Sequence, residues 1–180
     1  MGGDHVGKGK ASANGLMDKL YTDGLLRAVA ESEMDHNFYT VLALIFAVKE
    51  PVNANTLARL ANVELEIVLS ILSTLKSFLI ITDNSVQVLH KSFADMVTSK
   101  ERCIDQRFFV DTKHVDAKLA ERCLEVLCSN ELHINMLGIP TQEYTTNNVN
   151  TMSNFTSIPA EVIYSAKYMA THLKTAIVAH

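Results

Sequence analysis

Among the residues of this chain that could do chemistry, the histidines and cysteines, His90 has the most informative position. It follows a short β-forming run, residues 86–89, and begins a helical pattern that extends to about residue 100. Backbone N–H groups at a helix N-terminus point outward and the helix dipole is positive there, which favours a nearby anion. An imidazole at such a junction can donate a hydrogen bond to a phosphate oxygen. The alternative is that His90 caps its own helix or packs on the strands before it.

The remaining candidates form no catalytic or metal-binding group. The cysteines are odd in number and lack C-x-x-C spacing, which argues against disulfides or structural zinc and favours core residues in a reducing compartment: Cys103, Cys123 and Cys128. Three further histidines are scattered, and each is expected to be hydrogen-bonded or solvated: His114, His133 and His172. There is no G-x-S-x-G or H-E-x-x-H motif, and the Gly-Lys-Gly-Lys sequence at 7–10 lacks the spacing of a phosphate-binding loop. We therefore predict no catalytic residue, no metal and no enzymatic activity.

The composition favours a mainly helical globular protein. The chain has 180 residues, of which 48% are apolar and only three are proline, so a core can be buried. A formal net charge of -4 and the absence of Trp fit poorly with a protein that clamps phosphate backbones or stacks on bases. The N-terminus has no apolar signal segment, and the longest apolar run, residues 41–48, is too short to cross a bilayer. We expect a cytoplasmic protein with no membrane partner.

Hydrophobic periodicity places the elements that must position His90. We predict a disordered tail at 1–14, a lead-in helix from Gly15, and then three helices: one capped by Asp35 and ended by Pro51, one capped by Asn55, and one at 64–77. The inner face of the second and third of these four helices is expected to contain Phe38, Leu42, Ile45, Phe46, Leu57, Ala58, Leu60 and Ala61, and that of the fourth Leu65, Val68, Leu69, Leu72 and Leu75. Two strands, 78–81 and 86–89, flank a turn at 82–85, and a helix with Phe93, Met96 and Val97 inside follows. This order predicts a mainly α fold: a winged helix-turn-helix with a small β-hairpin wing, followed by a helical extension.

The extension contains two more helices on either side of a loop. Asp111 and Thr112 are predicted to cap a long amphipathic helix that ends near Ser129, with an inner face of Val115, Leu119, Cys123, Val126 and Leu127. Residues 135–155 are rich in Asn and Thr and are expected to form a loop. A last helix, 159–174, has apolar residues on more than one side: Ile163, Ala166, Tyr168, Ala170 and Leu173. That surface predicts a cover by further chain or by a partner.

A winged helix also raises the possibility of DNA binding, which the third helix of the motif argues against. Its outward face presents Glu64, Glu66, Ser70, Ser73, Thr74 and Lys76. Side chains that read the major groove are usually Arg, Lys, Asn or Gln, and two glutamates at the leading end would repel phosphates. The turn at 82–85 contains no Arg or Lys for a minor groove. Nucleic acid is therefore not the expected partner.

An ordered series of segments resembles a known family. The segments are LYTDGLLRAV, FYTVLALIFAVKEP, LHKSFADMVTSKERC, FFVDTKHVDAKLAERCLEVL and LHINMLGIP. Together they are similar to the region that follows the NACHT ATPase core in fungal NOD-like receptors, which are STAND-type signalling NTPases of innate immunity. The resemblance covers residues 16–173. It implies the end of a NACHT-like region at 15–33, a winged-helix domain at 34–102, a helical linker at 103–174 and a C-terminal tail at 175–180.

In that family the winged helix folds over the nucleotide-binding core in the resting state, and a histidine after the wing reaches the nucleotide's β-phosphate. The resemblance places this role on His90. Lys91 stands where many relatives have Asp, so the usual acidic contact is in doubt, and this cation could approach phosphate or point to solvent. No Walker motif precedes the winged helix and no repeat array follows, so the chain is expected to be a fragment that binds no cofactor alone, although ADP or ATP is implied for the full-length relative.

These observations lead to three functional hypotheses. The first is a non-catalytic regulatory module that couples nucleotide state to its protein partners, the NACHT core or other receptor domains. The second is a stand-alone helical domain for protein–protein interaction. The third, which the acidic helix disfavours, is a winged-helix DNA-binding regulator.

Overall fold

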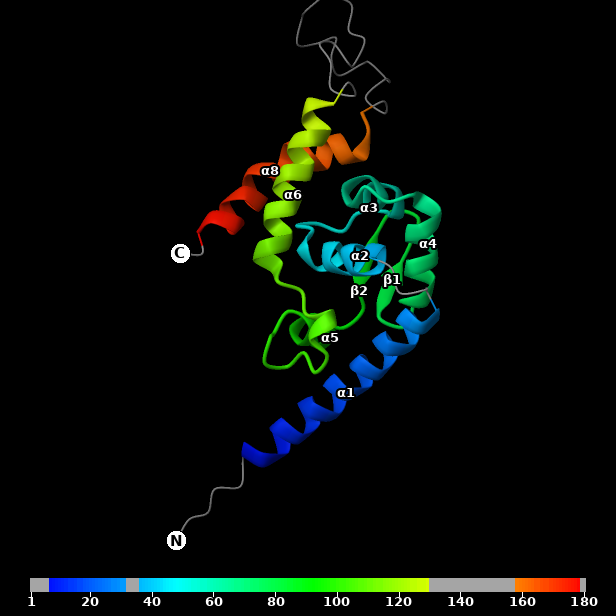
Figure 1. Cartoon of the computed structure of the whole chain (residues 1–180), viewed down its shortest axis with the longest axis vertical. Helices are drawn as coiled ribbons and strands as arrows, with labels where there is room; N and C mark the ends of the chain where they lie inside the picture. The colour runs from blue at the N-terminus through cyan, green and yellow to red at the C-terminus, as the bar shows by residue number, and fades with distance from the viewer. Residues whose placement is uncertain (1–6, 32–35, 130–157, 179–180) are drawn as a thin grey trace, which may run out of the picture. The chain divides into compact units, whose positions relative to one another are not determined.

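The computed structural model describes residues 7–31, 36–129 and 158–178 (Figure 1). Within these ranges the chain is mainly helical with one small antiparallel sheet of two strands, as the sequence predicts for the fold class. It divides into two compact units, unit 1 from Met1 to Val115 and unit 2 from Asp116 to His180. The two are described separately below. The finer segment boundaries taken from the resemblance remain predictions.

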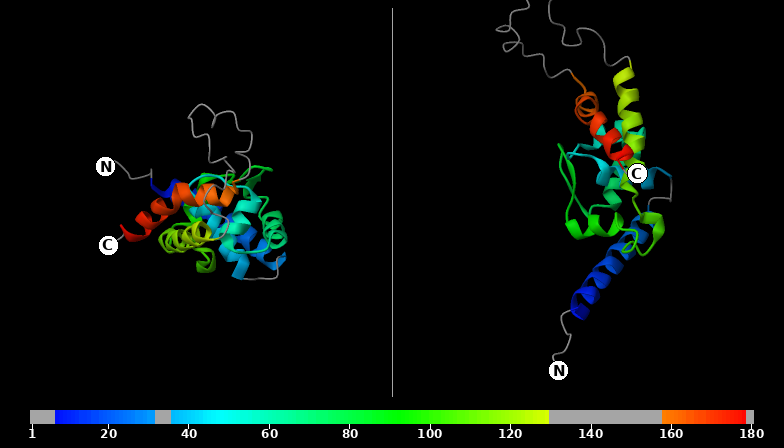
Figure 2. Two further views of the ribbon diagram at one scale, coloured as in Figure 1. Left: turned by 90° about the horizontal axis from the view of Figure 1, so that it is seen from above. Right: turned by 90° about the vertical axis from the view of Figure 1, so that its left-hand side faces the viewer.

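Unit 1 begins with a single long helix, α1 (Gly7–Glu31), whose two ends differ in their surroundings. Figure 2 shows its first turns extending away from the rest of the unit. Its later turns bury Tyr21, Leu25, Ala28 and Val29 and pack against α4 and α5. The predicted start at Gly15, with a disordered tail before it, is wrong for residues 7–14. Adding residues to a helix that is already formed costs little, because the unfavourable step is the first turn. Residues 1–6 lie outside the described range.

Three helices follow, α2 (His36–Ala47), α3 (Ala54–Ala61) and α4 (Leu65–Thr74), and each packs on the other two. The cap of α3 is Asn53 rather than the predicted Asn55: the Asn53 side chain accepts a hydrogen bond from the Thr56 N–H at 2.8 Å. The tight turn predicted after α3 is present. Asn62 adopts the left-handed conformation with φ 54°, which asparagine tolerates better than most residues, and its N–H closes the helix. Asp35, the predicted cap of α2, lies outside the described residues.

The predicted core faces of these helices are mostly confirmed. Phe38, Leu42, Ile45, Leu57, Leu60, Val68, Leu72 and Leu75 are buried. The prediction that Leu69 faces the core is wrong, because Leu69 is 48% exposed. Ile71 is buried instead. The inner stripe of α4 therefore runs through Val68, Ile71, Leu72 and Leu75. Because residues 67, 68, 69, 71 and 72 are all apolar, periodicity alone does not show which of Leu69 and Ile71 faces inward.

The sheet is a hairpin of β1 (Leu79–Ile81) and β2 (Val86–Val88), joined by the turn that the sequence predicts. Leu79 pairs with Val88 and Ile81 with Val86. A third extended segment touches this sheet: Val52, between α2 and α3, forms an antiparallel bridge with Val86, whose N–H donates to the Val52 carbonyl at 2.8 Å. The hairpin is thus hydrogen-bonded to the helical part of unit 1.

An aromatic cluster unites unit 1 around Phe93, on the short helix α5 (Lys91–Val97). Its ring stacks on Phe78 at 4.8 Å between centroids and lies 5.3 Å from Tyr21 and 5.4 Å from Phe46. These four residues come from α5, the lead into β1, α1 and α2. Three residues after α5 are also buried: Cys103, Phe108 and Val110. Phe108 is the last residue of the 3-10 helix η1 (Gln106–Phe108). The Val110 N–H donates to the Val97 carbonyl.

Unit 2 consists, in its described part, of most of α6 (Thr112–Cys128) and all of α8 (Ala160–Ile177), and α8 crosses α6 obliquely in Figure 1. Asp111 caps α6 as predicted: its Oδ1 accepts from the N–H groups of Lys113 and His114. Leu119, Cys123 and Val126 are buried as predicted, whereas Val115 and Leu127 are half-buried. Pro159 precedes the first turn of α8, which continues beyond the predicted end at residue 174. The predicted loop at 135–155 lies outside the described residues.

The packing explains the glycine inside α1. A Cβ built on Gly24 would lie 2.4 Å from Cζ of Phe78, whereas one built on Gly15 meets nothing within 4 Å. Gly15→Ala should therefore stabilise the protein by up to about 1 kcal/mol through helix propensity. Gly24→Ala should destabilise it, because displacing a stacked ring costs about 1–3 kcal/mol and exceeds that gain. Urea denaturation of both variants would measure the free energies of unfolding, and a stabilised Gly24→Ala would contradict this packing.

Candidate functional site

His90 lies at the junction between β2 and α5, as the sequence predicts. Its backbone is extended, with φ -129° and ψ 128°, and its side chain makes no capping hydrogen bond to α5. The residue is exposed, as is Lys91 beside it. The alternative in which the imidazole caps its own helix is therefore wrong. Helix α5 has only seven residues, so its dipole is not part of the candidate site. The candidate group is the imidazole, which can donate a hydrogen bond to a ligand.

The backbone around His90 is held from both sides. The Leu89 N–H donates to the Phe78 carbonyl at 2.8 Å, which fixes the end of the hairpin. Two residues beyond His90, the Ser92 hydroxyl bonds to the Tyr21 hydroxyl at 2.7 Å, and Phe93 enters the aromatic cluster. His90 is thus an exposed side chain on a fixed segment, the arrangement that lets a donor meet a ligand without first being ordered.

A partly buried ion pair secures α1 to the segment after α5. The Arg102 guanidinium donates twice to the Asp18 carboxylate, from Nε at 3.1 Å and from Nη2 at 2.6 Å. The hydrogen bonds that Arg102 donates to Asp18 raise the pKa of Arg102 above its usual value. A two-point pair of this geometry fixes direction as well as distance. It therefore orients the chain that follows α5 relative to α1.

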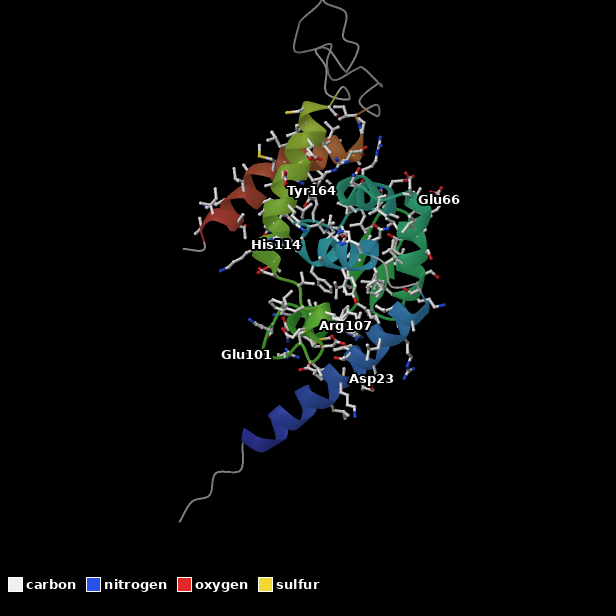
Figure 3. The ribbon with its side chains drawn as sticks, viewed as in Figure 1. Asp23, Glu66, Glu101, Arg107, His114 and Tyr164 are labelled. Atoms are coloured by element: carbon white, nitrogen blue, oxygen red, sulfur yellow. The ribbon has the colours of Figure 1, made fainter. Side chains whose placement is uncertain are left out.

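The outer face of α4 has the composition that the sequence indicates. Glu64, Glu66, Ser70, Ser73 and Lys76 are exposed, and Thr74 is half-buried. Glu66 points outward from the first turn of the helix in Figure 3. The exposed surface at this end of α4 is therefore acidic. It has the wrong sign for a phosphate backbone.

A second group was not predicted, because it joins residues far apart in the sequence. In unit 2, Nδ1 of His172 lies 2.5 Å from Oδ1 of Asp116, and Nε2 lies 2.8 Å from the Tyr164 hydroxyl, which Figure 3 labels on α8. The side chains of His172 and Asp116 are 0% and 2% exposed. The carboxylate accepts from Nδ1–H, while the hydroxyl can donate to Nε2 or accept from it. Both imidazole nitrogens therefore have a protein partner.

This group is enclosed, so it positions helices and is not placed to meet a substrate. It connects α6 to α8 through one carboxylate and links two turns of α8 through one ring. The sequence predicts only that His172 would be satisfied or solvated, and it is satisfied. An Asp–His pair across 56 positions has no local signature, but the placement of His172 and Tyr164 on one helix face was readable from their spacing. His114 is exposed, and His133 lies outside the described residues.

The three cysteines do not share one environment. Cys103 and Cys123 are buried as predicted, whereas Cys128 is exposed at the end of α6, so its assignment to the core is wrong. Burial raises the pKa of the Cys103 thiol, with smaller contributions from Asp105 and Asp18. Burial also raises the pKa of the Cys123 thiol, against opposing effects of Ser165 and Arg122. The two buried thiols are therefore held protonated and unreactive.

Unit 1 also has an open depression between α1 and the start of η1. Its lining combines charged, amide and apolar side chains: Lys19, Thr22, Asp23, Leu26, Ile104, Asp105 and Gln106. Arg107 pairs with Asp105 and holds the pKa of that carboxyl below its usual value. No side chain of this depression combines burial with a free polar group aimed inward. It supplies no catalytic arrangement.

Comparisons with known proteins identify no relative: no protein-family model, no curated protein and no solved structure matches the chain. Across the described ranges, His, Cys, Asp and Glu side chains form no group of three that could hold a metal ion. In the same part of the chain, none of the helices has the length and apolar content needed to cross a membrane.

The buried group in unit 2 can be tested by paired replacements. Tyr164→Phe removes one hydrogen bond and should lower the free energy of unfolding by about 1–2 kcal/mol. His172→Leu leaves the Asp116 carboxylate buried without its imidazole and should cost about 3–5 kcal/mol. Adding Asp116→Leu should recover part of that loss, and His114→Ala, on the exposed side of α6, should be neutral. Equal losses for His172→Leu and the double replacement would contradict a coupled pair.

Thiol accessibility separates the cysteines. A thiol reagent such as Ellman's reagent should modify Cys128 rapidly in the folded protein, and Cys103 and Cys123 only after denaturation, because burial blocks access and disfavours the thiolate. Mass spectrometry of the labelled protein would identify the modified position. Rapid labelling of Cys123 in the native state would show that α8 does not cover α6 as described.

Proposed function

We propose that this chain is a non-catalytic regulatory module of a NACHT-type signalling NTPase, with unit 1 as its winged-helix domain. The element order supports this reading of the fold. Helices α2, α3 and α4 are followed by the β1–β2 hairpin and then by α5. The bridge from Val52 to Val86 adds a short third strand between the first two helices of the motif, which is where a winged helix carries one.

One observation carries the proposal, and it concerns His90. The side chain is exposed, makes no capping hydrogen bond to its own helix, and stands on a segment fixed by Phe78 and Phe93. A histidine whose side chain makes no capping hydrogen bond at a strand–helix junction matches the position from which the NACHT family's histidine reaches the β-phosphate. Lys91, exposed beside it, adds a positive charge that would favour the same anion.

The mechanism is differential contact with two nucleotide states. With ADP in a NACHT core, His90 donates a hydrogen bond to the terminal phosphate and keeps unit 1 closed over the core. Exchange for ATP changes the position of the terminal phosphate, so the contact is lost and the open arrangement is favoured. A ligand shifts such an equilibrium only by its difference in affinity for the two states. His90 is the residue that supplies this difference.

DNA binding finds no support in unit 1. The leading end of α4 presents Glu64 and Glu66, and the turn between β1 and β2 has no basic residue. A protein partner fits this acidic helix better than a phosphate backbone.

The test joins this chain, in cis or as a separate protein, to a nucleotide-binding NACHT core and measures ADP retention. His90→Ala should weaken ADP binding by roughly 10–100-fold, because a hydrogen bond to a charged group contributes about 1.5–3 kcal/mol. His90→Ala should also raise basal signalling in the joined receptor. Fluorescent ADP displacement gives the affinity.

The matched control is His114→Ala, which removes another exposed histidine from unit 1. It should leave ADP retention unchanged. Lys91→Ala should have a smaller effect than His90→Ala if the lysine acts only as a screened charge. An unchanged ADP affinity for His90→Ala, with unit 1 shown to engage the core, would overturn the role of His90.

A further inference from the structure

An apolar seam runs along the outer side of α8, opposite the face that packs on α6. The inner face is marked by Tyr164, Ser165 and His172, all buried. The seam consists of residues at spacings of three and four, Ile163, Ala166, Ala170, Leu173 and Ile177, and all five are exposed. Its three large members are 51%, 46% and 61% exposed. The sequence predicts that such a surface is covered, and in the described residues it is open.

The spacing of the seam is that of a coiled-coil interface. Residues 163, 170 and 177 stand one heptad apart, and 166 and 173 fall at the intervening position, so the series reads a, d, a, d, a. The two alanines lie in the middle of the seam and the large residues nearer its ends. Small residues at the centre permit close approach of a second helix, while the large ones supply knobs. The geometry fits one more helix lying along α8.

The charges beside the seam restrict the partner. Lys167 and Lys174 occupy the two e positions and are the exposed charged residues of α8, whose only carboxylate, Glu161, is buried. Antiparallel pairing of two copies would bring Lys167 opposite the other copy's Lys174. Parallel pairing would place each lysine opposite Val162 or Met169, which cannot offer a charge. Neither orientation of a second copy is complementary, and the antiparallel one is repulsive.

We infer that the α8 seam binds an amphipathic helix of another protein whose flanking positions are acidic. This inference concerns unit 2 and does not depend on nucleotide sensing by His90. The apolar seam supplies the contact area, and Lys167 and Lys174 select the sign of the partner's flanks and its register. The Asp116–His172–Tyr164 group beneath holds α8 against α6, so the seam is presented on a fixed helix.

The experiment uses the full chain and two synthetic helical peptides of about three heptads, with Leu at a and d and either Glu or Lys at e and g. Like charges prevent either peptide from pairing with itself. Fluorescence anisotropy at low salt should give an affinity for the Glu peptide at least about tenfold tighter than for the Lys peptide, and the difference should shrink as salt screens the charges. The double replacement Lys167→Glu and Lys174→Glu should reverse the preference.

Leu173→Glu should abolish binding of the Glu peptide, whereas Ile104→Glu, at a 59% exposed position of unit 1, should leave it unchanged. Circular dichroism checks that both variants remain folded, as expected for exposed positions. Equal affinity for the two peptides, or binding of neither, would overturn the inference. So would a dimer of the chain in light scattering that Leu173→Glu dissociates, because a second copy would then be the occupant.

Discussion

The stacking of Phe93 on Phe78 is the contact on which the rest of unit 1 depends. The two rings lie 4.8 Å apart, and Tyr21 and Phe46 close around them from α1 and α2. Aromatic pairs bury large areas and add about 0.5–1.5 kcal/mol beyond that burial. Because Phe78 leads into the hairpin and Phe93 lies on α5, the stack fixes the ends of the segment that contains the turn and His90. A glycine at position 24 gives the Phe78 ring the room that it needs.

Unit 2 is joined in a different way, through a buried polar group. An apolar contact between α6 and α8 would tolerate sliding or rotation, since hydrophobic association has little directional preference. The Asp116–His172 hydrogen bond allows one rotation and one register, because a slip by one turn would leave a buried carboxylate without its imidazole. The Tyr164 hydroxyl fixes Nε2 of His172 in the same way, through a second hydrogen bond. The polar group thus determines which side of α8 faces α6, and consequently which side remains exposed.

Sequence patterns anticipated the parts of this fold that depend on neighbours along the chain. Helical periodicity placed the buried faces of α2 and α6, and turn residues placed the hairpin at 82–85, because both signals are local. The errors have physical causes. Asn53 and Asn55 are equally good caps by type, and Leu69 was misplaced because residues 67, 68, 69, 71 and 72 of α4 are all apolar. The position of His90 was anticipated, whereas the pairing of Asp116 with His172 depends on a contact between distant helices that no spacing reveals.

The two histidines show why residue type alone does not define a site. His172 is fully buried, and both of its nitrogens are engaged by protein groups, so it has no capacity left for a ligand. His90 is exposed and caps nothing, although its backbone is held between the hairpin and the aromatic cluster. A buried histidine repays its desolvation only through protein hydrogen bonds, while an exposed one on fixed backbone keeps its donors available at little entropic cost. The same side chain is therefore a structural link in unit 2 and an exposed imidazole in unit 1, and the difference lies in which partners the fold supplies.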